Sequence, residues 1–383
     1  MTFDFDRVID RAASDSRKWH KYAGRDILPL WVADMDFAAP PGVVASLERR
    51  VQHGVFGYAR AMPSLTEAVV TYCATHYRWK IEPSWIVWIP GLVTGLNLAA
   101  KALGERGDAV LTATPVYPPF MSAPKNQERE TILVDLVVRS DGRYEFDWAA
   151  MERAVTPRTR ALFLCSPHNP VSRVFTRVEL EQVAAFCLRH NLVLVSDEIH
   201  CDLILDDLPH IPVASLSSAI AARTITLMAP SKTYNIAGLA CSLAIIADPQ
   251  LRQQFSRAMQ GIIPEMSALA YAACEGALRD SEPWRQELLE YLRGNRDLLA
   301  SFLKERIPAI TMTPCEATYL AWLDVSALNL KDPGRFFEEQ GVGLADGAQY
   351  GAPAGKFVRL NFGCPRAILT EALNRMQRAV AAR

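Results

Sequence analysis

The sequence predicts an α/β fold built on a mainly parallel sheet, with a smaller α+β domain beside it. From about residue 42 to residue 280, helical stretches alternate with short apolar runs, as they do where crossover helices join parallel strands. The chain has 383 residues, and half of them are hydrophobic, so it is long enough for two domains and a sizeable core. We therefore expect the larger domain to carry the sheet.

The expected domain boundaries lie near residues 45 and 283. The first segment is loop-rich and ends at the Pro40-Pro41 break, whereas a long amphipathic helix begins near Ser281. We expect a large domain over 45–282 and a small domain made of 1–44 together with 283–383. The expected helices are 42–53, 64–78, 94–104, 147–154, 177–190, 265–279, 283–306 and 366–381. The expected strands are 86–90, 109–111, 162–165, 192–197, 224–228, 319–323 and 357–362.

The first two strands of the large domain are each followed by a possible binding element. Gly91, Leu92 and Val93 come directly after the strand 86–90 and precede a helical stretch. The backbone N–H groups at such a helix start can bind a phosphate, although glycine turns before helices are common and the motif alone is weak. Tyr117 follows the strand 109–111, where its ring can stack on a planar molecule or simply pack in the core.

Polar side chains also follow the next two apolar runs. Asn169 stands at the tip of a turn after the strand 162–165, and Asp197 ends the apolar run Leu192 to Ser196. An amide there can donate to a bound molecule, but Asn-Pro is also an ordinary turn pair. A buried carboxylate needs a charged partner, and a protonated pyridine nitrogen is one; capping of a following helix is the alternative for Asp197.

Lys232 follows the last strand of this series, 224–228, and precedes a loop that contains Gly238. A lysine that loses its proton easily in such a place can form a Schiff base with an aldehyde cofactor. The alternative interpretation is an ordinary surface lysine at the end of a strand. The intervals are 28 residues from Asn169 to Asp197 and 35 from Asp197 to Lys232, and each fits one helix plus a crossover. The three groups are then expected to meet at the carboxyl ends of the strands, as in a pyridoxal phosphate (PLP) site.

Composition and charge exclude several other classes of protein. The formal net charge is -1, from 41 basic and 42 acidic residues, which gives no general case for nucleic-acid binding. The eight cysteines form no CxxC pair and no Cys/His spacing typical of a metal site, so we expect reduced core cysteines and no metal. The acidic start Met1 to Asp6 lacks a signal-peptide pattern, and no apolar run is long enough to span a membrane. We expect a cytoplasmic protein.

Several segments carry a family resemblance. They include Trp31 to Phe37, Asp197 to His200, Ser231 to Leu239 and Glu316 to Asp324. Over essentially its full length the chain resembles the fold-type I PLP-dependent enzymes, and within them the MalY/PatB family of cystathionine β-lyases (C–S lyases). This resemblance implies the fold-type I architecture, with a mainly parallel seven-stranded sheet in the large domain.

The resemblance also implies roles for individual residues. Lys232 is expected to bind PLP covalently and then to carry the α-proton of the substrate. Asp197 is expected to pair with the pyridine nitrogen, Asn169 to contact the ring oxygen and Tyr117 to stack on the ring. His200, which stands where many relatives have a tyrosine, belongs to the same cofactor-binding set. The phosphate is expected to contact the backbone of Gly91, Leu92 and Val93 and the side chain of Ser231.

Three more residues have expected roles outside the cofactor ring. Tyr58 matches a tyrosine that reaches the phosphate in the neighbouring subunit, which implies a homodimer. Arg359 matches the arginine that binds the substrate carboxylate through two parallel hydrogen bonds, with a surface ion pair as the alternative. Ala33 stands where wider relatives often have a glycine near that carboxylate, so it is expected to line the substrate site. The sequence departs from wider relatives at Ala240, where an arginine often binds the phosphate, and at Ala229, where a serine is frequent.

The expected activity is β-elimination on a sulfur-containing amino acid. With cystathionine as substrate, the products are homocysteine, pyruvate and ammonia. Two alternatives remain: an aminotransferase of class I or II, and a regulatory protein that uses the same scaffold. The intact set of Lys232, Asp197, Asn169 and Arg359 disfavours the regulatory protein, because a binding module has no need of a Schiff-base lysine.

Overall fold

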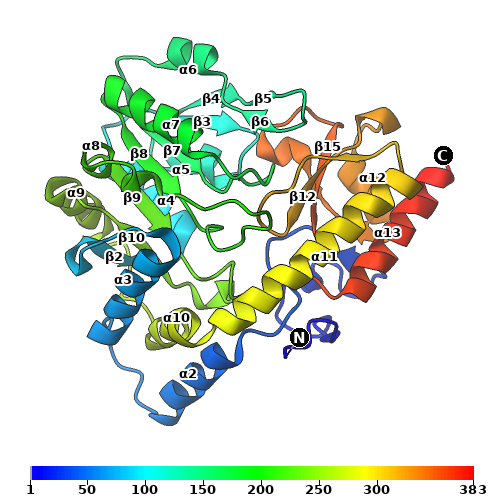
Figure 1. Cartoon of the computed structure of the whole chain (residues 1–383), viewed down its shortest axis with the longest axis horizontal. Coiled ribbons are helices and arrows are strands. Elements are labelled where there is room, and N and C mark those ends of the chain that lie inside the picture. Colours follow the sequence, from blue (N-terminus) through cyan, green and yellow to red (C-terminus); the bar gives the residue numbers. More distant parts are fainter. Residues whose placement is uncertain (1) are drawn as a thin grey trace.

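A computed structural model describes residues 2–383 of the chain (Figure 1). Its largest sheet has seven strands in the order β2-β10-β9-β8-β7-β3-β4. All neighbouring pairs are parallel except those of β10, which runs antiparallel to both β2 and β9. The predicted fold class, with a mainly parallel seven-stranded sheet, is confirmed. The strands are β2 (Ile86–Ile89), β3 (Ala109–Thr114), β4 (Glu130–Asp135), β7 (Thr159–Cys165), β8 (Val193–Asp197), β9 (Thr224–Met228) and β10 (Ser242–Ile245).

The central strands are apolar without interruption because helices cover both faces of the sheet. Side chains alternate between the faces: Leu194 of β8 packs in the cluster that contains Phe186 of α7 (Arg177–Arg189), whereas Val195 packs with Leu96 of α4 (Leu92–Ala102). Every residue of β3 and β9 is buried. This burial explains why the strands read as continuous hydrophobic runs rather than as alternating ones.

A second, four-stranded sheet has the order β11-β12-β15-β14 and is antiparallel throughout. Its strands are β11 (Thr311–Met312), β12 (Leu320–Asp324), β14 (Ala345–Asp346) and β15 (Phe357–Asn361). The long helix α11 (Glu282–Arg306) and the C-terminal helix α13 (Arg366–Ala381) lie beside each other next to this sheet (Figure 1).

The N-terminal segment is tied to the C-terminal part of the chain. Its short strand β1 (Leu28–Pro29) pairs in parallel with β13 (Val342–Gly343). Phe5 and Leu30 belong to the same core cluster as residues of α11 and α13. The domain boundaries at residues 45 and 283 stay a prediction.

The remaining helices follow the expected pattern with small shifts at their ends. Helix α4 begins at Leu92, earlier than expected, because Gly91 has φ +94° and turns the chain sharply after β2. Sequence reasoning did not identify five of the helices: α5, α9, α12 and the two four-residue helices α1 (Arg17–His20) and α8 (Ser218–Ala221). The further helices are α2 (Pro41–Gln52), α3 (Pro63–Tyr77), α5 (Pro119–Asn126), α6 (Trp148–Ala154), α9 (Pro249–Met259), α10 (Ala268–Asp280) and α12 (Pro333–Glu339).

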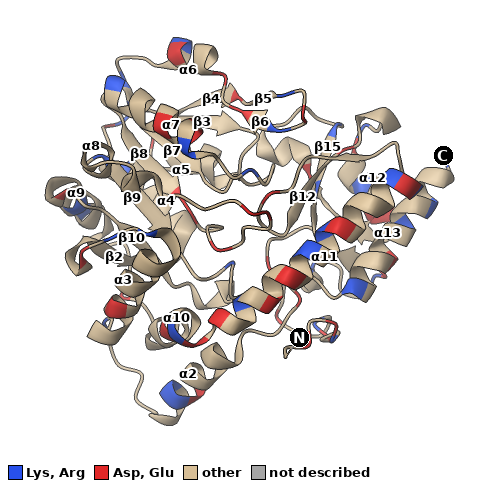
Figure 2. Ribbon diagram, in the orientation of Figure 1, with Lys and Arg blue, Asp and Glu red and all other residues tan. Residues whose placement is uncertain are grey.

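Charged side chains of both signs are interspersed over the outer helices. Basic and acidic residues alternate along α11 and α13 (Figure 2), in keeping with the near-zero net charge. Within residues 2–383, every helix is too short or too polar to cross a membrane.

Candidate active site

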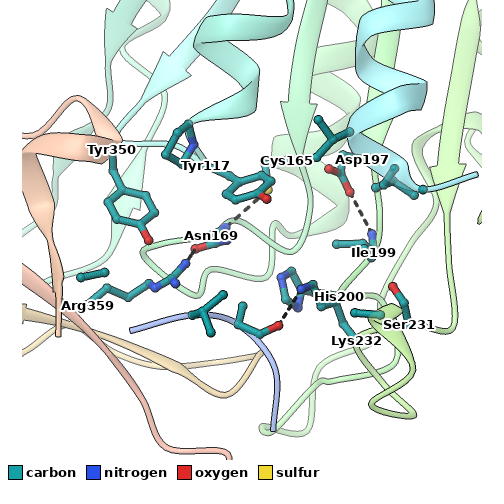
Figure 3. A pocket seen from close by; sticks show the side chains of 18 of the residues that line it. Tyr117, Cys165, Asn169, Asp197, Ile199, His200, Ser231, Lys232, Tyr350 and Arg359 are labelled. Atoms are coloured by element: carbon teal, nitrogen blue, oxygen red, sulfur yellow. Dashed lines mark hydrogen bonds between the residues drawn. The ribbon is translucent and has the colours of Figure 1, made fainter. Parts of the chain in front are cut away.

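A cavity of about 340 Å³ lies between the carboxyl ends of the large sheet and the smaller sheet. The strands β7, β8 and β9 are neighbours in the sheet, so the turns that follow them converge on this cavity. Figure 3 shows side chains from these turns and from β15 directed toward one another. All but one of the residues singled out from the sequence line it: Ala33, Gly91, Leu92, Val93, Tyr117, Asn169, Asp197, His200, Ser231, Lys232 and Arg359. The exception is Tyr58, which is 99% exposed and lies outside this lining.

Lys232 enters the cavity from the turn that follows β9. Its Nζ donates a hydrogen bond to the carbonyl oxygen of Ala33 at 2.6 Å (Figure 3), so it is not the surface lysine of the alternative interpretation. Burial lowers the pKa of its ammonium group to about 8, with the charge of Arg359 acting in the same direction and the charges of Asp34 and Asp197 opposing it. A substantial fraction of Lys232 is therefore neutral near physiological pH and able to attack an aldehyde.

Asp197 ends β8 and is buried at the base of the cavity. Its Oδ1 accepts a hydrogen bond from the backbone N–H of Ile199 at 3.1 Å. In the described part of the chain no Lys or Arg side chain forms an ion pair with it, and burial raises its pKa to about 7. Residues 199–202 form turns, so Asp197 does not cap a helix. Its carboxylate is suited to a cationic group that enters the cavity, such as a protonated ring nitrogen.

Asn169 and Tyr117 come from adjacent turns, which are joined by a backbone hydrogen bond. The N–H of Tyr117 donates to the carbonyl oxygen of Asn169 at 3.1 Å, and the N–H of Asn169 donates to Cys165 Sγ at 3.4 Å. The Tyr117 ring is partly exposed to the cavity (Figure 3), where a planar molecule can stack on it.

Arg359 projects from β15 and is only 3% exposed. Its Nη1 donates to Asn169 Oδ1 at 3.0 Å, its Nη2 donates to the carbonyl oxygen of Trp31 at 2.8 Å, and its guanidinium lies 4.9 Å from the centre of the Tyr350 ring. Among residues 2–383 no carboxylate forms an ion pair with it, and its buried Nε has no hydrogen-bond partner. A buried guanidinium held only by neutral acceptors is a site for an anion, and it is not the surface ion pair of the alternative.

His200 presents a neutral imidazole to the cavity. Burial lowers its pKa to about 3, and the positive charges of Lys232 and Arg359 add to this effect. Its buried Nδ1 has no hydrogen-bond partner among the described residues. The ring packs edge-on near Tyr319, with 6.2 Å between the ring centres. His200 is therefore available as a neutral hydrogen-bonding group toward a bound molecule.

The opposite end of the cavity fits a phosphate. Gly91 is the N-cap of α4, and the N–H groups of the first turn of a helix have no acceptor within the helix. Ser231 and Ser242 line the same cavity and offer hydroxyl groups, whereas Ala240 supplies only a methyl group. The charge of a phosphate bound there would be met chiefly by backbone N–H groups and the helix dipole rather than by an arginine of the same chain at position 240.

Several lining residues were not identified from the sequence. Trp31 and Tyr350 frame Arg359, and Arg17 and Gln349 lie on the same lining. None of them follows an apolar strand run, which is the signal that identified Asn169, Asp197 and Lys232. Within the described residues, no group of three or more His, Cys, Asp or Glu side chains is placed to hold a metal ion.

Comparisons with known proteins agree with this geometry. Residues 25–376 match the family model "Aminotransferase class I and II". The chain is 38% identical to cystathionine beta-lyase PatB of Bacillus subtilis, over 99% of this chain and 100% of that protein. It is similar to the crystal structure of OvoB, with 46% identity, a TM-score of 0.96 and full coverage of both chains. It is also similar to cystalysin of Treponema denticola with bound pyridoxal 5'-phosphate, with 32% identity, a TM-score of 0.96 and full coverage of both chains.

Proposed function

The chain belongs to the aminotransferase class I and II family, and from that premise we propose that it is a PLP-dependent carbon–sulfur lyase acting on sulfur-containing amino acids. The observation that carries the proposal is the placement of Lys232, Asp197, Asn169 and Arg359 around one cavity. The similarity to cystathionine beta-lyase PatB over the full length favours β-elimination over other reactions of the family. The expected resemblance to this family is confirmed.

PLP is the cofactor, and the groups that line the cavity fit its parts. Asp197 would face the ring nitrogen, Tyr117 would stack on the ring, and Asn169 with His200 would contact its oxygen side. Gly91, Leu92, Val93 and Ser231 would hold the phosphate. When bound, PLP supplies an aldehyde for the substrate amine and a ring that accepts the electron pair left at Cα.

The side chains of the protein bind the substrate and move its protons. Arg359 binds the α-carboxylate through its guanidinium, and Ala33 lines the space beside it. The Nζ of Lys232, whose pKa is about 8, removes the α-proton as a general base. The Cβ–S bond then breaks, and the sulfur leaves as a thiolate with the bonding electrons. Water hydrolyses the remaining three-carbon enamine to pyruvate and ammonia.

We propose that the active enzyme is a homodimer in which Tyr58 reaches the site of the neighbouring subunit. The segment around it is exposed and apolar: Val55 is 64% exposed, Phe56 58% and Met62 58%. Exposed apolar side chains in such a group are typical of an interface between subunits. A hybrid of Tyr58→Ala and Lys232→Ala subunits restores one intact site if Tyr58 acts across the dimer, so mixing the two inactive variants should recover activity.

The test is the release of pyruvate and thiol from L-cystathionine by the PLP-loaded protein without any added 2-oxo acid. We expect equal amounts of both products, loss of the reaction in Lys232→Ala, and no loss in the exposed control Lys80→Ala. Amino transfer that appears only when a 2-oxo acid is supplied would establish the aminotransferase alternative instead. No detectable product in either assay would contradict an enzymatic role on these substrates and favour the regulatory alternative. The cytoplasmic location stays a prediction.

A further inference from the structure

The cavity carries more positive charge than the reaction at its base requires. Three cationic side chains line it, Arg17, Lys232 and Arg359, against one carboxylate, Asp197. Under the proposed function, Lys232 bonds the cofactor, Arg359 binds the α-carboxylate of the substrate and Asp197 pairs with the ring nitrogen. Arg17 is left without a role in these contacts.

The backbone that carries Arg17 is fixed at the mouth of the cavity. Arg17 is the first residue of the short helix α1 (Arg17–His20). The buried Lys18 beside it forms an ion pair with Asp36 at 2.8 Å and donates to the carbonyl oxygen of Asp34 at 3.0 Å. Trp31 Nε1 donates to the carbonyl oxygen of Lys18 at 3.1 Å. These contacts attach α1 to the segment that also supplies Ala33 and Trp31 to the cavity.

The side chain of Arg17, by contrast, has no partner in the described part of the chain. It is exposed, forms no ion pair and makes no side-chain hydrogen bond with residues 2–383. Burial raises the pKa of the Tyr117 phenol, and the positive charge of Arg17 partly opposes this rise. Gln349, which lines the same cavity, is also exposed and makes no side-chain hydrogen bond with these residues. The mouth thus offers a guanidinium and an amide, with no acidic side chain beside them on the lining.

We propose that Arg17 binds a second carboxylate, carried by the sulfur substituent of the substrate, with Gln349 as an additional donor. The inference rests on the proposed function and names its substrate class: cysteine thioethers whose leaving thiol ends in a carboxylate. Arg359 then holds the carboxylate that stays with pyruvate, and Arg17 holds the one that leaves with the thiol. A planar guanidinium with free N–H groups is the side chain best suited to a carboxylate.

The experiment compares two substrates of similar size, S-(2-carboxyethyl)-L-cysteine and S-butyl-L-cysteine, with the PLP-loaded enzyme. The measured quantity is the preference, defined as the ratio of their kcat/KM values. We expect Arg17→Gln to lower this preference about five- to tenfold, mainly through KM for the carboxylate, since a partly exposed ionic hydrogen bond contributes about 1 kcal/mol. Arg153→Gln, which removes an exposed arginine on α6, should leave the preference of the parent enzyme in place.

A charge reversal sharpens the test. Arg17→Glu should favour S-(2-aminoethyl)-L-cysteine over the carboxyethyl substrate, and added salt should weaken the preference of the parent enzyme because salt screens an exposed charge pair. An equal effect of Arg17→Gln on both substrates, or none on either, would overturn the assignment while the lyase function stands. If the parent enzyme releases pyruvate from L-cystathionine but cleaves none of these thioethers, the inference fails while the lyase function stands. If it does not cleave L-cystathionine either, the proposed function fails and the inference fails with it.

Discussion

Arg359 and Asn169 share a hydrogen bond in which the guanidinium Nη1 donates to the amide Oδ1 at 3.0 Å, although 190 residues separate them in the chain. The bond orients both groups. With its oxygen committed to Arg359, the Asn169 amide can turn its NH₂ group toward a bound ring oxygen, and the guanidinium keeps its other N–H groups for a carboxylate. The two proposed functions, cofactor contact and substrate binding, are therefore coupled through one contact between the two sheets.

Arg359→Lys should lose most of the substrate affinity while it keeps the positive charge. A lysine cannot reproduce the planar pair of donors or the bond to Asn169, so we expect kcat/KM on L-cystathionine to fall about 100-fold, mainly through KM. Steady-state kinetics would measure this, together with the absorbance of the bound cofactor, which should persist. The matched control is Arg335→Lys on the exposed face of α12. A KM within about twofold of the parent value would contradict the role of Arg359.

Asp197→Asn should make the cofactor-free protein more stable at neutral pH and the enzyme nearly inactive. The folded pKa of Asp197 is about 7, well above its usual value of 3.8. Between these two values the folded state holds a proton that the unfolded state has lost, so the stability of the parent falls as pH rises through this window. The uncharged asparagine avoids that loss. Thermal unfolding of the two apoproteins should therefore diverge from about pH 4 to about pH 7 and stay apart above it.

The same substitution removes the charge that keeps the ring nitrogen protonated, so activity should fall by at least about 100-fold with PLP bound. Equal stability of the two apoproteins at neutral pH would contradict the assignment of Asp197 as an unpaired buried carboxylate.

The base of the site could be predicted from the sequence, whereas the mouth could not. Asn169, Asp197 and Lys232 each follow an apolar run, and adjacent parallel strands bring such positions to one edge of a sheet. Trp31 comes from an irregular segment and Arg17 from the four-residue helix α1, and the positions of both depend on contacts with other segments of the chain. The hydrogen bond from Arg359 to the carbonyl oxygen of Trp31 joins residues that are 328 positions apart, and no local sequence pattern predicts it.

Similar reasons explain the elements that sequence reasoning did not identify. Helix α9 has few apolar residues, although its buried positions Leu251, Phe255 and Ala258 have the spacing of one helix face. The signal that was overlooked lies at its start, where Asp248 caps the helix and Pro249 occupies the first turn. The role of Tyr58 depends on a second subunit, so the fold of one chain does not test it.

Glu316→Gln should destabilise the protein and disturb the turn that carries Asn169. Glu316 is buried, and its Oε2 accepts from Arg173 Nε at 3.0 Å and from the N–H of Val174 at 2.8 Å, while its Oε1 accepts from Arg143 Nε at 2.6 Å. Removal of one charged partner of a buried ion pair typically lowers the free energy of unfolding by about 3–5 kcal/mol. Chemical denaturation of the holoenzyme would measure the shift in midpoint. Glu339→Gln removes an exposed ion pair on α12 and should produce no measurable shift, and an equally small shift for both variants would contradict this prediction.

Asp34→Asn should let the protein capture its cofactor at lower pH. Only the neutral amine of Lys232 attacks the aldehyde, so the capture rate of the apoprotein should rise with pH through the lysine pKa of about 8 and level off above it. The negative charge of Asp34 raises that pKa by stabilising the ammonium form, and its buried Oδ1 has no hydrogen-bond partner among residues 2–383. Removal of the charge therefore shifts the midpoint of the rate profile to lower pH.

The opposite shift is expected for Arg359→Gln, because the charge of Arg359 lowers the pKa of Lys232. Rapid mixing of apoprotein with PLP from about pH 6 to about pH 10, followed by the absorbance of the lysine-bound cofactor, would give both midpoints. Asp15→Asn, at an exposed position, is the matched control and should keep the midpoint of the parent. If Asp34→Asn and Arg359→Gln moved the midpoint in the same direction, loss of structure rather than loss of charge would be the cause. Opposite shifts around an unmoved control would assign the reactivity of Lys232 to the balance of charges around it.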